Sequence, residues 1–169
     1  MRTLDEKNWA EASASSLEYF FSAVCRVAQL LGDDMRPFLP NIMHTAWQEM
    51  KAAPEIRIVR GLDNDNLDMD KLEGEGWEAL QLGREESILV NTNSLARLEA
   101  AAVCLMTLVE RIPEAVSPYA EQTVNVLLAA DGAERELLPE RVKTAAMVAL
   151  SKCLRLHRQP AVSNGYLHP

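Results

Sequence analysis

The 169-residue chain has a formal net charge of −8, with 48% hydrophobic, 25% charged and 5% aromatic residues. An acidic chain without a basic stripe is a poor partner for nucleic acid, because neutralising phosphates needs clustered Lys and Arg. We expect no membrane partner either, because no apolar run approaches the roughly 18 residues that a span requires. Ala and Leu dominate while Gly is scarce, which favours helices over sheets.

The first predicted unit is a helical hairpin over residues 15–52, which follows an N-terminal extension of residues 1–14. In its first helix, apolar residues recur at the spacing of one helix face: Leu17, Phe20, Phe21, Val24, Val27, Ala28 and Leu31. Gly32 is a suitable stop for that helix. The second helix begins near Pro37 and carries a further apolar face.

Residues 53–93 are predicted to be an acidic insertion loop. Seven acids against one base, Lys71, give a local charge of −6; they are Asp63, Asp65, Asp68, Asp70, Glu73, Glu75 and Glu78. One interpretation is a solvated loop whose charge keeps a long insertion soluble. The other is a loop that binds a basic partner, since closely spaced carboxylates attract cations and raise association rates.

A tryptophan lies within the end of the acidic run. Trp77, Leu80 and Leu82 alternate with polar neighbours, and we expect them to dock the end of the insertion on the first or second hairpin. A direct contact between Trp77 and a ligand is the alternative.

The hairpin layout returns in residues 94–130. Pro118 follows Pro37 by 81 residues, and Tyr119 follows Phe38 by the same interval. Residues 131–158 contain the first helix of a further repeat, in which Val142 follows Leu98 by 44 residues. Residues 159–169 form a polar tail.

The interval of 44 lies in the range of helical-hairpin repeats of the HEAT or armadillo type, about 40–47 residues. We therefore predict an all-α HEAT-repeat solenoid of about two and a half hairpins, without β-sheet, and expect a fragment of a longer array. An irregular helical bundle is the alternative. The expected helices cover residues 15–31, 36–52, 94–112, 117–130 and 138–157. The expected core includes Leu17, Phe21, Val24, Leu105, Leu108, Val142 and Leu150.

Catalytic and metal-binding patterns are poorly supported. The acidic run does not fit the register of an EF-hand loop, because Leu67 or Met69 falls where oxygen ligands are needed. Cys25, Cys104 and Cys153 are far apart and show no CxxC spacing, so we expect reduced, unmetallated, mostly buried thiols. The three histidines form no nucleophile pattern. We predict no enzyme activity, cofactor or metal.

The stretches "AVCRVAQLLGDDMRPFLPNIM", "GEGWEALQLG" and "PYAEQTVNVLL" resemble the importin-β family of nuclear transport receptors, and within it the importin-five, or karyopherin beta-three, branch. The resemblance implies a section of a nuclear import receptor that carries protein cargo with basic targeting signals. It also implies that the full-length receptor binds Ran-GTP and phenylalanine-glycine nucleoporins, and moves between cytoplasm and nucleus. A HEAT-repeat scaffold subunit for complex assembly is the alternative function.

Overall fold

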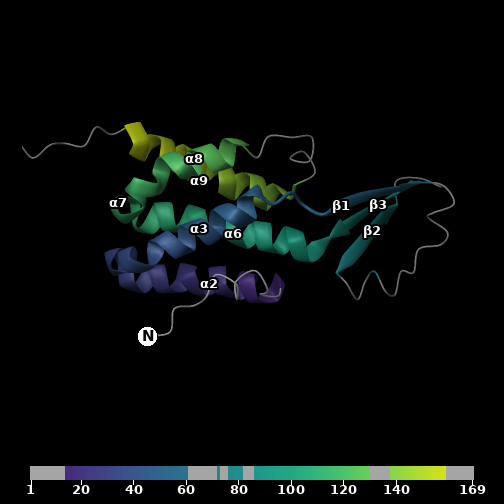
Figure 1. The fold of residues 1–169 in the computed structure, drawn as a ribbon, viewed down its shortest axis with the longest axis horizontal. Helices are drawn as coiled ribbons and strands as arrows, with labels where there is room; N and C mark the ends of the chain where they lie inside the picture. The colour runs from purple at the N-terminus through teal and green to yellow at the C-terminus, as the bar shows by residue number, and fades with distance from the viewer. Residues whose placement is uncertain (1–13, 61–71, 73–75, 82–85, 130–137, 159–169) are drawn as a thin grey trace, which may run out of the picture.

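The computed structural model describes residues 14–60, 72, 76–81, 86–129 and 138–158 (Figure 1). Within these residues, five long helices agree with the predicted ranges to within three residues at each end. They are α2 (Ala14–Leu31), α3 (Leu39–Lys51), α6 (Thr92–Arg111), α8 (Ala120–Ala129) and α9 (Glu140–Arg158).

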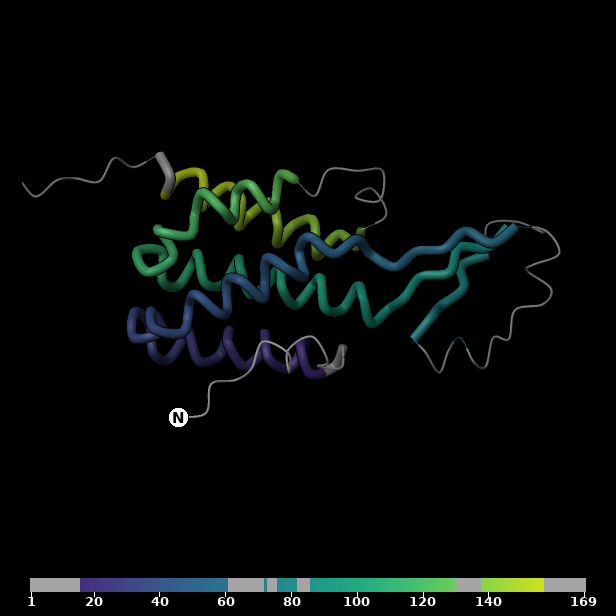
Figure 2. The backbone as a smooth tube through the Cα atoms, viewed as in Figure 1, coloured from purple at the N-terminus to yellow at the C-terminus, as the bar shows by residue number. Residues whose placement is uncertain are grey.

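The helices form two layers of stacked hairpins. The first helices of the three repeats, α2, α6 and α9, pack in that order, with α6 in the middle. The second helices, α3 and α8, pack on each other, and each also contacts a helix of the first layer, α6 and α9 respectively. The backbone trace in Figure 2 shows the helices side by side. This arrangement confirms the predicted all-α solenoid of hairpin repeats.

The connections inside the two hairpins correspond, as their shared interval of 81 residues predicts. Gly32 has a φ of 55°, in the left-handed region that glycine adopts readily, and it ends α2. A 3₁₀ helix, η1 (Gly32–Phe38), then contains Pro37, and a second one, η2 (Ser117–Tyr119), contains Pro118. A short helix, α7 (Pro113–Val116), precedes η2.

The core lies between the layers and along the seam where the repeats meet. All the residues predicted to be buried are buried except Leu150, which is only partly covered. Alanines of α6 and α9 are also buried, and their small side chains let helix backbones approach closely: Ala101, Ala102, Ala145, Ala146 and Ala149. Of the three cysteines, Cys104 and Cys153 are fully buried and Cys25 is partly exposed but mostly covered, which confirms the predicted burial of the thiols.

A polar contact joins the second helices of the two hairpins. The indole Nε1 of Trp47, on α3, donates to the buried hydroxyl of Thr123, on α8, at 3.1 Å. That hydroxyl in turn donates to the backbone carbonyl of Tyr119 at 2.8 Å. The rings of Trp47 and Tyr119 lie 6.2 Å apart, within the range of aromatic pairs. The two hairpins are therefore held in a defined register.

A three-stranded antiparallel sheet contradicts the prediction that the insertion is a loop without strands. Its strands are β1 (Ile56–Arg60), β2 (Trp77–Gln81) and β3 (Glu86–Asn91), in the order β1-β3-β2. Both "IRIVR" and "ESILV" are rich in the β-branched residues Ile and Val, which favour strands. The acidic run between these two stretches favoured the prediction of a loop instead. The sheet is confined to the insertion, so the repeat assignment is unaffected.

We predict that Thr123→Val lowers the free energy of unfolding by about 1–3 kcal/mol. The substitution leaves the buried indole N–H of Trp47 without its acceptor, and an unpaired buried donor carries the full cost of its lost hydration. The measurement is urea unfolding followed by helical circular dichroism.

Thr45→Val is the matched control, because the Thr45 hydroxyl also donates to the carbonyl four residues earlier but accepts no hydrogen bond from a tryptophan in the described part of the chain. It should change stability by less than about 0.5 kcal/mol. Equal losses in both variants would mean that the Trp47 contact contributes nothing.

Candidate functional site: the sheet-bearing insertion

The sheet projects from one end of the helical stack, where α3 ends and α6 begins (Figure 1). Strand β3 is central and leads directly into α6, while β1 follows α3 after a short connection. In the register, Trp77 of β2 pairs with Asn91 next to α6, whereas Arg60 of β1 pairs with Glu86 at the far end. Arg60 and Gly76, which flank six of the seven acids of the run, thus lie at opposite ends of the sheet.

Trp77 fixes the beginning of β2. Its side chain is only 4% exposed, and the guanidinium carbon of Arg57, on β1, lies 4.3 Å from the ring centroid. A guanidinium at that distance over an indole face makes a favourable cation–π contact. The contact between the Trp77 ring and Arg57 joins the two edge strands, β2 and β1, across the central strand β3. Strand β2 is therefore held to the sheet by this side-chain contact as well as by its backbone pairing with β3.

The residue before Trp77 has to be glycine. Gly76 has a φ of 81°, and a Cβ atom there would collide with the side-chain amide of Asn93. The Gly76 carbonyl accepts two hydrogen bonds from Thr92, at 2.8 Å from the backbone nitrogen and 2.9 Å from the hydroxyl. The end of the acidic run is therefore attached to the first residue of α6.

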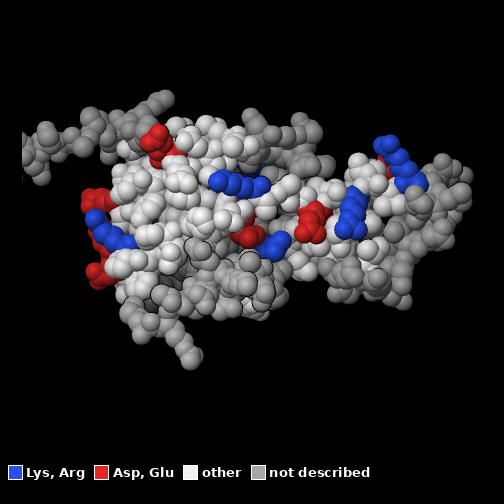
Figure 3. Space-filling model, viewed as in Figure 1, with Lys and Arg blue, Asp and Glu red and all other residues white. Residues whose placement is uncertain are grey.

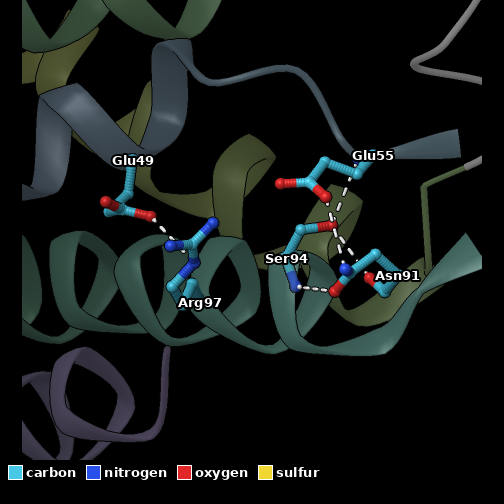
Figure 4. Close-up of polar contacts among 5 residues, drawn as sticks. All are labelled: Glu49, Glu55, Asn91, Ser94 and Arg97. Atoms are coloured by element: carbon cyan, nitrogen blue, oxygen red, sulfur yellow. Dashed lines mark hydrogen bonds and ion pairs between the residues drawn. The ribbon is translucent and has the colours of Figure 1, made fainter. Parts of the chain in front are cut away.

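A polar junction joins β1 to the start of α6 (Figure 4). Asn91 caps α6, because its side-chain oxygen accepts from the Ser94 backbone nitrogen at 3.1 Å. The Asn91 backbone nitrogen donates to the Glu55 carbonyl at 2.9 Å, and its side-chain nitrogen donates to the Glu55 carboxylate at 3.2 Å. The Ser94 hydroxyl accepts from the Glu55 backbone nitrogen at 3.2 Å. This network orients the sheet relative to the helices.

An ion pair between α3 and α6 lies further along α6 from this junction and is also drawn in Figure 4. Arg97, on α6, approaches Glu49, on α3, with 3.6 Å between Nε and Oε2, and their side chains are 27% and 17% exposed. The Arg97 Nε is buried and has no hydrogen-bond partner among the described residues. The pair joins α3 to α6 directly behind the junction.

The two faces of the sheet differ in character. One face carries the buried side chains of Trp77, Leu89 and Ser87. The opposite face carries aliphatic residues from all three strands: Ile56, Ile58, Leu80, Ile88 and Val90. Of these, Ile58 and Leu80 are each 58% exposed. Beyond them, an ion pair of 2.7 Å between Arg60 and Glu86 closes the far end of β1 and β3.

The structure describes few of the predicted site residues. Glu78 is exposed on β2; the other six acids and Leu82 lie outside the described residues. Trp77 is buried near α6, but Leu80 is exposed, which corrects its assignment as an anchor. Successive strand residues point to opposite faces, so Trp77 and Leu80, three residues apart, cannot share one.

Sequence reasoning missed the residues that attach the sheet: Glu55, Arg57, Gly76, Asn91 and Ser94. An available signal was "NTNS" at the start of the helix, since Asn and Ser are preferred at helix N-termini. In the described part of the chain, no cluster of three or more His, Cys, Asp or Glu side chains is arranged to hold a metal ion. No helix there is long and apolar enough to span a bilayer. On the face drawn in Figure 3, acidic and basic side chains of the described residues are interspersed.

No protein-family model matches the sequence. The fold is similar to that of Kap121p in crystal structures with Pho4p, Ste12p and Nup53p, each with a TM-score of 0.61. Sequence identity is 16%, and each alignment covers 82% of this chain. It covers only 13% of the Kap121p chain, so this chain corresponds to a small part of that protein.

We predict that Trp77→Ala lowers the free energy of unfolding by about 2–4 kcal/mol, because it removes a buried aromatic side chain and its contact with Arg57. The measurements are chemical unfolding and hydrogen exchange of the β3 amides, which report on the sheet itself.

Leu80→Ala, on the same strand, is the control and should cost less than about 1 kcal/mol, because its side chain is mostly in water. If both variants exchange their β3 amides equally fast, Trp77 does not anchor the sheet.

Proposed function

We propose that this chain is a section of a nuclear import receptor of the importin-β type, in which stacked hairpins form a scaffold and the insertion meets a basic segment of protein cargo. The observation that carries the proposal is the likeness of fold to Kap121p over 82% of the chain. Kap121p has been crystallised bound to Pho4p, Ste12p and Nup53p. The assigned role is binding and carrying, without catalysis, in a receptor that moves between cytoplasm and nucleus.

The charge of the insertion supports a basic partner. The run from Asp63 to Glu78 carries −6 of the chain's net −8. Arg60 and Gly76, the described residues on either side of six of these seven acids, are held at opposite ends of the sheet, the first by Glu86 and the second by Thr92. A dense acidic segment tethered at both ends loses less entropy on binding than a free tail, and it attracts a Lys/Arg-rich segment over several ångströms.

In the full-length receptor, the same proposal includes binding of Ran-GTP and of phenylalanine-glycine nucleoporins. A scaffold subunit for complex assembly is the competing function, and its stacked hairpins would look the same. A pull-down of the full-length parent protein with Ran loaded with GTP or GDP separates the two. A receptor should bind the GTP form preferentially, whereas a static scaffold should bind neither.

We predict that replacing Asp63, Asp65, Asp68 and Asp70 together by Asn weakens binding of a Lys/Arg-rich peptide by about fivefold or more at low ionic strength. The loss should shrink as salt is added, because screening reduces the contribution of exposed charges. Thermal stability should barely change, since exposed carboxylates contribute little. The measurements are a salt titration of peptide affinity and a thermal melt.

The matched control neutralises four exposed acids of the helical stack, Glu18, Asp34, Glu114 and Glu121, and so removes the same total charge. It should retain most of the affinity. Equal weakening in both variants would assign the attraction to the overall net charge. A much lower melting temperature with unchanged affinity in the first variant would make the acidic run a structural element.

A further inference from the structure

The three-stranded sheet has one apolar face that is open to solvent. Its middle row consists of Ile58, Ile88 and Leu80, which lie directly opposite one another on the three strands and therefore point to the same side. Ile58 and Leu80 are each 58% exposed, and Ile88 is partly covered. The next row toward α6 contains Ile56 and Val90, which are also only partly covered. These five residues form the aliphatic face, and all of them retain contact with solvent.

The opposite face of the same strands is covered. There Trp77, Ser87 and Leu89 are all buried. The exposure of the aliphatic face is therefore a property of that face and does not follow from the position of the sheet at the end of the helical stack. Single exposed apolar side chains are ordinary on a protein surface, whereas a contiguous group across neighbouring strands is typical of a docking surface.

The charges beside the aliphatic face indicate what it binds. Glu78 is exposed and lies opposite Val90, so it is on this face, two residues before Leu80 on β2. At the far end, Arg60 and Glu86 form an ion pair of 2.7 Å and compensate each other's charge. Glu78 is also the last acid of the run that carries −6. A segment that docks beside this carboxylate gains most if it brings positive charge.

The same charges argue against other occupants of the aliphatic face. Two copies of this chain packed face to face would bring together two insertions that each carry −6, and like charges across an interface are unfavourable. The phosphates of nucleic acid or of an anionic membrane would be repelled in the same way. A purely basic segment would satisfy the carboxylate but would leave the five aliphatic side chains in water, so it would not use the apolar part of the surface.

We propose that the aliphatic face docks a segment of protein cargo in which apolar side chains are flanked by Lys or Arg. This inference rests on the proposed function and makes its partner more specific, because the basic segment must also carry apolar anchors. In an extended segment, side chains two residues apart lie on one side, about 7 Å from each other. Ile56 and Ile58 have the same spacing along β1, so two such anchors cover the two rows of the face while a flanking base meets Glu78.

The test measures the affinity of the complete 169-residue chain for three matched synthetic peptides. The first peptide has two Leu residues, two positions apart, between pairs of Lys residues; the second has Ser in place of Leu, and the third has Ser in place of Lys. We expect the first to bind about tenfold or more tightly than the second, because burying Leu removes apolar surface from water. This advantage should persist at high salt, where screening weakens only the charged part. The third should bind more weakly than the first at low salt.

Two variants locate the binding surface. Ile58→Thr combined with Leu80→Thr removes the most exposed apolar side chains of the face and supplies β-branched residues that suit strands. It should weaken binding of the first peptide about fivefold or more and leave binding of the second unchanged. The matched control, Leu128→Gln combined with Met147→Gln, removes exposed apolar side chains from the helical stack instead. It should leave both affinities unchanged, and a thermal melt of each variant checks that the fold is retained.

The possible outcomes separate this inference from the proposed function. Equal affinity for the first and second peptides, or equal losses in the sheet variant and the control, would overturn the docking surface and leave the acidic run as a site for basic segments. If neither Lys-containing peptide binds, the proposed function fails together with this inference. A third peptide that binds as tightly as the first would refute the need for basic residues. A dimer in sedimentation that the sheet variant dissociates would assign the face to a second copy of this chain.

Discussion

The burial of α6 on several sides is the constraint on which the rest of the structure depends. A single amphipathic hairpin cannot cover its own apolar face, so α6 packs between α2 and α9 and also receives α3. Buried alanines at Ala101 and Ala102 permit this close approach, while Leu105 and Leu108 fill the space further along the helix. The layer of first helices is therefore centred on α6.

The same helix carries the insertion. Its first turn is capped by Asn91, and the adjacent Thr92 holds the Gly76 carbonyl. The first backbone N–H groups of a helix need hydrogen-bond acceptors. At the start of α6, the Gly76 carbonyl accepts from the Thr92 backbone nitrogen, and the Asn91 side chain accepts from that of Ser94. The sheet is therefore attached directly to the start of α6, and the ion pair between Arg97 and Glu49 joins α6 to α3 behind it.

The scaffold and the proposed binding segment place different demands on the chain. The stack is stabilised by non-directional apolar burial, which tolerates small shifts between repeats. In the proposed function, the acidic run would act through charge, which does not require a defined packing arrangement.

The sequence by itself determined the helices and their repetition, because the 3.6-residue period of apolar side chains is a local signal and the matched Pro37 and Pro118 mark equivalent 3₁₀ turns. Tertiary structure alone decided the sheet register that exposes Leu80 and buries Trp77, and the hydrogen bond between Trp47 and Thr123. Each joins residues far apart in sequence or depends on such pairing, and no local period records which distant partner a side chain will meet.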